Sequence, residues 1–561
     1  MRIGRRAGAC LLAAALCFGL LSGCGQSAAS GGDGEGLSLS VCVGGAPSTL
    51  DPIYATASGD VTVLNHLYEN LMKIAADNSG GTSVVNGLAK SYHTDENKDG
   101  TVTYSFRLRN AKWSDGTAVT AQDFVYAWRR LANPVCGSPN ASLLSIVKGY
   151  DEVQSTGDTA ALAVEAKNDQ TFVVTLTSVC DWFLTDVCTA PAAAPLREDV
   201  IQRLKADAET ANQESAAGET GRVSWWSDYT KLVTSGGYTV QSYNSDSLML
   251  RKSGETGGPD TLTFRYADSP EAAWNLYEAG TVDFVSPLPE SQLTELAKNP
   301  NWTPKTELST CTLLFNTGSD EFNDPAVRQA FSLALDRNTL SAAAGVENTP
   351  ASGLVPPGVP GTEDEDFRTA GGELVDCNPE EYAADCGEAA RLLENAGYTA
   401  GYRFPAVELL YPEGENRQAV ASAMADMWAR TLNAAVTPRA VSRTELAAAL
   451  SAGNYTLAMT DVGSLVNDAE GFLTLWASDD SRNAAGYINS AYDTLLAIIG
   501  KANDETARRG CLHDAEQLLL EECPLTPLFF TGMDNRLRET WTGVCRDARG
   551  FYSFSTAARL H

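Results

Sequence analysis

The chain has 561 residues and a formal net charge of −30 at pH 7, with 71 acidic against 41 basic side chains. This acidic balance argues against nucleic acid as a partner, because phosphate binding requires clustered Lys and Arg. A hydrophobic fraction of 43% is typical of a globular chain and not of a disordered one. The length indicates two or three domains.

The N-terminus has the pattern of a secretory signal. Three arginines precede an apolar run that ends in Leu21-Ser-Gly-Cys24, and this run is shorter than the roughly 20 residues of a membrane span. The tetrapeptide resembles a bacterial lipobox, which predicts a signal peptide over 1–23 and lipidation of Cys24. A plain signal peptidase site near Gly23 is the alternative. Residues 24–36 are small and polar, as expected of a flexible tether.

The cysteines of this chain can be either disulfide-bonded or free thiols. The chain has 13 cysteines, and ten remain after the signal peptide and Cys24 are set aside. An even count in an exported chain permits disulfides, with Cys377–Cys386 and Cys180–Cys188 as local possibilities, and buried thiols are the alternative. None of the ten has the spacing of a structural zinc site. We expect neither a metal nor a cofactor.

The first elements of the mature chain are a strand and a helix. Residues 37–43 alternate in polarity and predict a strand, and a helix with His66 follows Leu50-Asp-Pro52. We interpret His66 as a surface or satisfied histidine. Asp95-Glu-Asn-Lys-Asp-Gly100 begins like a calcium loop, but Phe106 stands where the loop requires a bidentate Glu. A hairpin turn is therefore expected there.

The segment 102–131 predicts a strand, a turn and a capped helix. Residues 102–109 alternate, and Ser114-Asp-Gly-Thr117 has turn chemistry. Thr120 is placed as an N-cap, and Asp123 follows at capping-box spacing. Apolar residues then recur at helical spacing, and we assign Trp128, like Trp113, to the core.

Strands and helices alternate through the rest of the chain, which predicts an α/β protein with mixed sheets. Asp324 is placed as a helix cap with Pro325 at the first helical position, where proline is tolerated. Further segments with strand or helix patterns are Leu276–Phe284, Leu313–Asn316, Phe322–Arg337, Tyr455–Thr460 and Pro524–Phe530.

The segment from Asn110 to Arg130 closely resembles the signature of the family 5 extracellular solute-binding proteins. The later segments given above resemble other parts of the same family. The resemblance implies a two-lobed periplasmic-binding-protein-like fold of class II, with mixed sheets and a hinge crossed twice. It assigns 37–310 to the first lobe, with an inserted subdomain at about 85–195. It assigns 311–524 to the second lobe and 525–561 to a return into the first.

The resemblance also implies a function. Such proteins are the substrate-binding components of ABC importers, and those that take peptides bind them extended, through main-chain hydrogen bonds. We therefore expect a lipid-anchored monomer on the outer side of the cell membrane, or in the periplasm if there is an outer membrane. It would capture oligopeptides between the lobes and deliver them to the permease subunits. A nickel chelate, haem, an oligosaccharide or a peptide-sensing role are the alternatives.

The ligand positions carried over from the family include one departure. Many peptide binders hold the ligand's α-ammonium with an Asp where this chain has Leu465. A buried ammonium without a counter-charge is costly, so either Asp461 or Asp468 substitutes, or the ligand has no free amine there. Asp468 is alternatively a turn or capping residue. The full predicted set is Ala57, Ser58, Asn140, Asp461, Val462, Gly463, Leu465 and Asp468.

Catalysis is not expected. The chain has four well-separated histidines and no HExxH, G-x-S-x-G or GxxxxGK[ST] motif, so the compact catalytic signatures are missing. We predict no catalytic residue, and a secreted hydrolase is the remote alternative.

Overall fold

The computed structural model describes residues 36–76, 81–211, 224–254, 257–361, 365–399, 404–502 and 504–560. The predicted signal peptide, the lipidation site at Cys24 and the tether up to residue 35 lie outside these ranges. Within the described part, no helix combines the length and apolar character needed to cross a bilayer.

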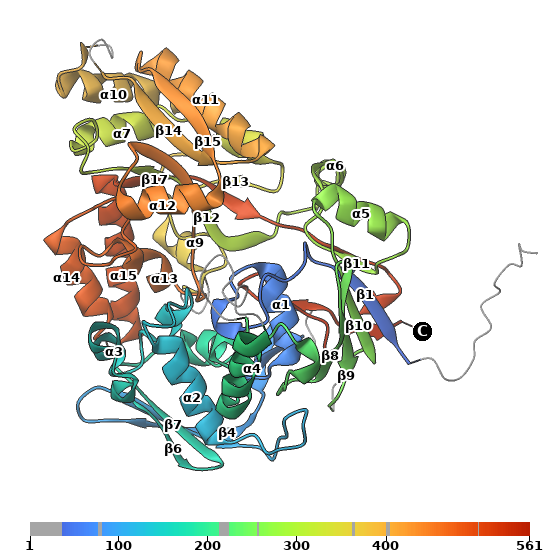
Figure 1. Ribbon diagram of the computed structural model, residues 1–561. Helices are drawn as coiled ribbons and strands as arrows, with labels where there is room; N and C mark the ends of the chain where they lie inside the picture. The colour runs from blue at the N-terminus through green and yellow to red at the C-terminus, as the bar shows by residue number, and fades with distance from the viewer. Residues whose placement is uncertain are drawn as a thin grey trace, which may run out of the picture. The chain divides into compact units, whose positions relative to one another are not determined.

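The first lobe is built on a six-stranded sheet in the order β18-β11-β1-β10-β9-β8. β1 runs parallel to β10 and β11, and the other pairs are antiparallel, so the sheet is mixed (Figure 1). The strands are β1 (Ser38–Cys42), β8 (Tyr238–Tyr243), β9 (Ser247–Lys252), β10 (Thr261–Arg265), β11 (Phe284–Val285) and β18 (Arg536–Leu537).

The second lobe is built on another mixed sheet, in the order β13-β17-β12-β16-β14-β15. β14 is parallel to β15 and β16, whereas β12 is antiparallel to β16 and β17. The strands are β12 (Thr306–Phe315), β13 (Thr349–Pro350), β14 (Val407–Pro412), β15 (Val436–Val441), β16 (Leu457–Gly463) and β17 (Leu525–Gly532).

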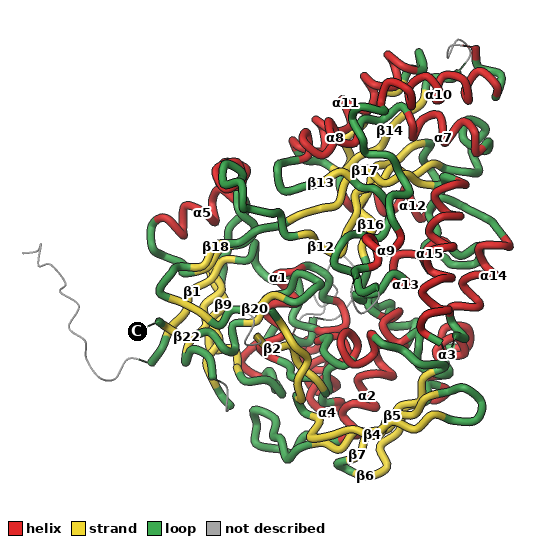
Figure 2. The backbone as a smooth tube through the Cα atoms, turned by 180° about the vertical axis from the view of Figure 1, so that it is seen from behind, coloured by secondary structure: helices red, strands yellow, loops and turns green. Residues whose placement is uncertain are grey.

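The alternation of side chains along β12 places helices on both faces of this sheet. Leu313 and Phe315 pack into one buried cluster with α7, α8, α10 and α11, whereas Leu314 packs into a second cluster with α9 and α12 to α15. Figures 1 and 2 show these two groups of helices on opposite sides of the strands. The helices are α7 (Pro325–Leu333), α8 (Arg337–Ala344), α9 (Phe367–Gly371), α10 (Tyr382–Asn395), α11 (Glu415–Thr431), α12 (Arg443–Ala452), α13 (Glu470–Leu473), α14 (Ser490–Ile499) and α15 (Glu505–Glu522).

A separate four-stranded antiparallel sheet, β4-β5-β7-β6, lies inside the range predicted as an inserted subdomain. The hairpin of β4 and β5 confirms the turn at residues 97–101, where a calcium loop was the rejected alternative. Its strands are β4 (Ala89–Glu96), β5 (Val102–Leu108), β6 (Val164–Asn168) and β7 (Thr171–Leu176). The other first-lobe helices are α1 (Ser58–Leu67), α2 (Ala121–Ala132), α3 (Tyr150–Thr156), α4 (Glu198–Ala211), α5 (Pro270–Glu278) and α6 (Glu290–Leu296).

The predicted helix starts are confirmed. The Asp123 carboxylate accepts the Thr120 N–H at 2.8 Å, which completes the capping box of α2. Asp324 caps α7 by accepting the Ala326 N–H at 2.9 Å, with Pro325 at the first helical position. Trp128 is fully buried on α2 and donates to the Ala193 carbonyl at 2.9 Å.

The chain passes between the two six-stranded sheets twice, once between β11 and β12 and once between β17 and β18. Strand pairing moves the predicted end of the second lobe, because residues 525–532 form β17 and pair with β12. Leu528 and Phe529 belong to the second-lobe core, so the return begins after Gly532 and not at 525. The predicted first-lobe end at 310 moves as well, because β12 starts at Thr306 and its first residues pair with β16 and β17. The other bounds of the lobes stay predictions.

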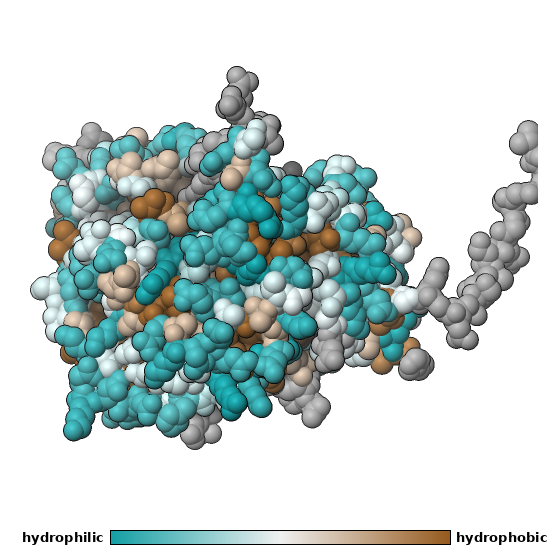
Figure 3. Space-filling view, turned by 60° about the horizontal axis from the view of Figure 1, so that its bottom comes forward, coloured by the Kyte–Doolittle hydropathy of each residue, from teal (hydrophilic) through white to brown (hydrophobic). Residues whose placement is uncertain are grey.

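Short two-stranded ribbons complete the described part. They join β2 (Met72–Ala76) to β3 (Thr82–Asn86), β19 (Trp541–Thr542) to β22 (Ala558–Arg559), and β20 (Cys545–Arg546) to β21 (Tyr552–Ser553). The ten cysteines from Cys42 to Cys545 are free thiols, so neither local disulfide is present. On the face shown in Figure 3, hydrophilic residues predominate and hydrophobic ones form separate patches.

Candidate functional site

Two adjoining cavities lie between the lobes. One has a volume of about 250 Å³ and the other of about 270 Å³, and both are lined by Leu143, Ser464 and Leu465. The first cavity also contacts Pro52, Ala55, Thr56, Ser58, Val61, Asn140, Ala190, Pro191, Ala192, Glu307, Leu308, Ser309, Arg549 and Phe551. The second also contacts Ser142, Ser145, Ile146, Thr177, Trp182, Gly463, Val466, Glu470, Gly471, Thr474, Leu475, Arg482 and Gly500. We call the two cavities together the cleft.

The second-lobe wall of the cleft is the end of the β12–β16 ladder. Ser309 pairs with Gly463, and the Ser464 N–H then donates to the Leu308 carbonyl at 3.3 Å. The Ser464 hydroxyl accepts the Val466 N–H at 3.1 Å, which closes a turn and leaves Leu465 37% exposed. Because no described residue bonds to the Leu465 backbone amide or carbonyl, these groups are available to an extended ligand.

The first-lobe wall is fixed by side chains that bond to backbone. Asn140 is buried, and its amide nitrogen donates to the carbonyls of Ile53 at 3.2 Å and Ala55 at 2.9 Å. The Ser58 hydroxyl donates to the Gly550 carbonyl at 3.3 Å. Asn140 therefore holds the segment that follows Asp51 in place, and the surface presented to the cleft consists largely of small side chains and backbone.

Direct contacts join the lobes beside the cleft. The Asp186 carboxylate, in the first lobe, accepts the backbone N–H of Asn467, in the second, at 3.1 Å. Arg549 lies 3.8 Å from Asp186 and donates to Asp547 at 2.8 Å. Burial raises the pKa of Asp186, against the opposing effect of Arg549. A second, peripheral contact places Arg509 3.9 Å from Asp181.

The two carboxylates predicted as partners of a ligand amine are both engaged internally. Nη2 of Arg417 donates to both oxygens of Asp461, at 2.8 and 2.9 Å. Arg508 donates to the two oxygens of Asp468 at 2.7 and 3.2 Å. Asp468 is buried and also accepts the Glu470 N–H at 2.8 Å, as in the alternative interpretation of a turn residue; the N-cap of α13 is Ala469. Neither carboxylate lines the cleft.

The structure thus brings together part of the predicted set. Ser58, Asn140, Gly463 and Leu465 line the cleft, whereas Ala57, Asp461, Val462 and Asp468 do not. Their roles in ligand binding stay predictions.

Sequence reasoning missed Glu307, Trp182 and Arg549, which also line the cleft. These three residues are far apart in the chain and belong to no motif, so no local signal could have found them.

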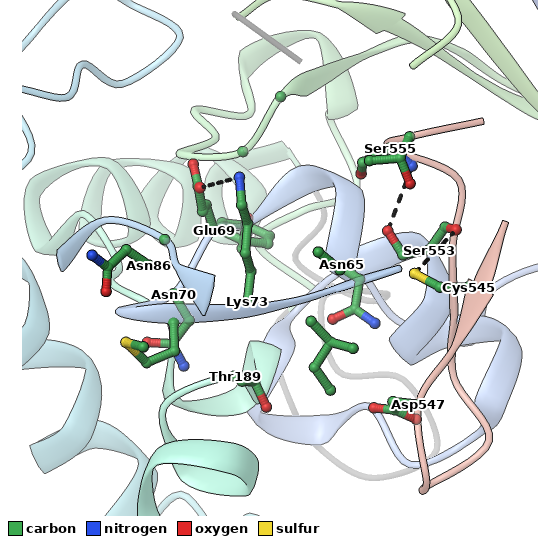
Figure 4. Close-up of a pocket in the computed structure, with 18 of the residues that line it drawn as sticks. Asn65, Glu69, Asn70, Lys73, Asn86, Thr189, Cys545, Asp547, Ser553 and Ser555 are labelled. Carbon is green, nitrogen blue, oxygen red and sulfur yellow. Dashed lines mark hydrogen bonds and ion pairs between the residues drawn. The ribbon is translucent and has the colours of Figure 1, made fainter. Parts of the chain in front are cut away.

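A larger cavity of about 460 Å³ lies entirely within the first lobe (Figure 4). It is bounded by the end of α1, the β2–β3 ribbon and the C-terminal segment, and Lys73 and Glu69 form an ion pair of 3.4 Å on its wall. It shares Arg549 and Phe551 with the cleft. Because no second-lobe residue lines it, we assign the site to the cleft.

Two of the described histidines, His66 and His513, pack against other side chains. His66 is buried, its Nδ1 lies 2.7 Å from the Thr62 carbonyl, and its Nε2 accepts the Phe554 N–H at 2.9 Å. Desolvation lowers the pKa of His66 to about 4, so the ring is neutral. His513 stacks on Phe367 at a centroid distance of 4.0 Å. Among the described residues, no group of three His, Cys, Asp or Glu is placed to hold a metal.

Comparison with known proteins gives consistent results. The model of the bacterial extracellular solute-binding proteins, family 5, matches residues 83–484. The chain is 29% identical over 512 residues to the periplasmic murein peptide-binding protein MppA of Escherichia coli, covering 88% of each chain. It is 28% identical over 511 residues to the periplasmic oligopeptide-binding protein OppA of Salmonella typhimurium, covering 88% of this chain and 87% of that one.

A probable deoxycholate-binding periplasmic protein of Escherichia coli is 28% identical over 498 residues, covering 86% of each chain. Among solved structures, Haemophilus influenzae OppA in complex with the peptide RPPGFSPFR has a TM-score of 0.75 and 25% identity, covering 94% of this chain and 99% of that one.

Proposed function

Since the chain belongs to the bacterial extracellular solute-binding proteins of family 5, we propose that it captures extended oligopeptides in the cleft and delivers them to the permease of an ABC importer. The observation that carries the proposal is the second-lobe wall, where the Leu465 backbone is left unbonded by the described residues beside a cavity shared by both lobes. An extended peptide supplies the matching amide groups. The named peptide-binding relatives support the same ligand class.

Broad side-chain tolerance follows from the same geometry. The cleft surface near Ser58, Asn140 and Ala190–Ala192 offers small side chains and backbone, so water can fill the space around different ligand side chains. The backbone of the ligand is common to all peptides and supplies the constant part of the affinity.

Calorimetry and native mass spectrometry test the ligand class. The mature protein, purified from its own host, should carry co-purified peptides, and added peptides of three to nine residues should bind with a stoichiometry of one. Retention of a nickel chelate, haem, an oligosaccharide or a bile acid, with no peptide binding, would reject the proposal. Incubated peptides should be recovered intact by chromatography, because the proposed role includes no bond cleavage.

The proposal includes a lipid anchor at Cys24 and a monomeric protein on the outer side of the membrane. The lipobox-like Leu21-Ser-Gly-Cys24 followed by a small, polar segment supports the anchor. Replacing Cys24 with Ser should release the protein from the membrane fraction without changing peptide affinity. If the variant stayed in the membrane fraction as much as the wild type, the lipid anchor would be rejected, and the proposal of peptide binding would not be affected.

A further inference from the structure

The cleft lacks an acid at the position where family resemblance would place the partner of the ligand's α-ammonium. That position is Leu465, which lines both cavities. Asp461 and Asp468 are held by Arg417 and Arg508. Because a desolvated ammonium needs a counter-charge, the carboxylates that do line the cleft become relevant. They are Glu307 in one cavity and Glu470 in the other.

Glu307 lies near the start of β12 and is incompletely paired. Arg546 donates to Oε1 of Glu307 at 3.2 Å. Gly550 packs against this ion pair, and a Cβ atom added at residue 550 would lie 3.1 Å from Nη2 of Arg546. No described residue donates to Oε2, and the side chain is 24% exposed. The carboxylate therefore has one oxygen available beside the cavity that it lines.

The basic groups on the same side are already neutralised. Arg549 lies against Asp186 and Asp547, and Arg546 against Glu307. Three carboxylates thus face two guanidinium groups, so the wall has an excess negative charge. Burial raises the pKa of Glu307, and the negative charge of Asp461 adds to this effect. A cation beside Glu307 would restore the balance in a partly desolvated site.

Glu470 is a weaker candidate. Arg508 donates to its Oε2 at 2.8 Å, a shorter contact than that of Arg546 with Glu307. Arg482 also lines this second cavity and is paired with Asp480 at 2.6 Å, so this pair adds no net negative charge that would favour a cation there.

We propose that Glu307 receives an ammonium group of the peptide, either the α-ammonium or that of a lysine side chain, through the carboxylate oxygen that Arg546 leaves free. The inference rests on the peptide-binding function proposed above. It makes Glu307 a specificity-determining residue and predicts a preference for peptides with a positive charge at this end of the cleft.

Calorimetry with three matched ligands tests the proposal. They are tetra-alanine amide, its N-acetylated form, and an N-acetylated tetrapeptide amide with one lysine in place of alanine. The wild-type protein should bind the N-acetylated alanine peptide roughly tenfold more weakly than the form with a free amine, because a charge-assisted hydrogen bond is lost. Recovery of affinity with the lysine peptide would identify the side chain as a second source of the ammonium, whereas no recovery would restrict the site to the α-ammonium.

Glu307→Gln should remove the difference between the free and acetylated peptides, and Glu470→Gln should preserve it. Both variants remove one negative charge from the cleft wall, so a general electrostatic effect would change both equally and would overturn the proposal. The proposal would also be overturned if the Glu307→Gln variant still bound the free peptide more tightly than the acetylated one. Equal affinity of the wild-type protein for the free and acetylated peptides would overturn it without any variant. If the wild-type protein binds none of these or longer peptides, the proposed function itself fails.

Discussion

Removal of the Asp186 carboxylate should speed ligand release, because this group joins the lobes. It accepts the Asn467 N–H across the boundary at 3.1 Å, while its contacts with Thr185 and Arg549 lie within the first lobe. Opening of the cleft breaks the contact with Asn467 and leaves the others in place. Asp186→Ala should therefore destabilise the closed form relative to the open one.

The magnitude follows from the kind of bond. A hydrogen bond to a charged group contributes about 1.5–3 kcal/mol, and we take the lower end because water reaches Asp186 and Asn467 when the lobes separate. About 1.5 kcal/mol corresponds to a roughly tenfold weaker affinity. We expect most of this change in the dissociation rate, as is common for variants of one interface.

Stopped-flow measurement of peptide release, with tryptophan fluorescence as the signal, checks this expectation, since Trp182 lines the cleft. Asp181→Ala is the matched control, because Asp181 also faces the second lobe, but it lies 3.9 Å from Arg509 and its side chain is 56% exposed. Such a pair contributes about 1 kcal/mol or less. An Asp186→Ala release rate within twofold of wild type, or an equal effect of Asp181→Ala, would refute the reasoning.

Three further predictions concern stability and specificity. His66 should contribute a loss of about 3 kcal/mol of stability as pH falls from 6.5 to about 4, because its pKa is about 4 when folded and the unfolded chain binds the proton first. Urea titrations of wild type and His66→Gln, compared at each pH, should show this difference. Asp468→Ala should lower the free energy of unfolding by about 1.5–3 kcal/mol, because the buried Arg508 loses one carboxylate partner and keeps Glu470 and Glu505. The affinity ratio of free to acetylated peptide should stay unchanged in calorimetry. Leu465→Asp should raise that ratio severalfold, because it adds a carboxylate to the cavity that contains Glu307; an unchanged ratio would show that residue 465 lies too far from the ligand amine.

Local elements could be predicted from the sequence where the determining interactions are short in range. The capping box of Thr120 and Asp123, the Asp324 cap and the hairpin after Asp95 each depend on residues within a few positions of one another. The fold class followed from a resemblance dense enough to cover much of the chain, and the family match confirms it.

The boundary at residue 525 failed for the opposite reason. The run that begins at Leu525 is apolar and suits either lobe, and its pairing with β12 is a contact between segments about 200 residues apart. Asp461 and Asp468 show the same limit, because their arginine partners lie 44 and 40 positions away. The spacing of charged residues along the sequence does not show which of them form ion pairs in the folded protein.

The sequence by itself determined helix and strand starts such as the capping box of Thr120 and Asp123, since these depend on periodicity and neighbouring residues. The class of the protein followed from the family resemblance, which also rests on the sequence alone. The tertiary structure alone decided which carboxylates remain available to a ligand. Asp461 and Asp468 are neutralised by arginines on α11 and α15, and Glu307 keeps one free oxygen beside the cleft. The physical reason is that charge pairing and desolvation depend on distances between elements, which arise only when the two sheets and their helices have packed.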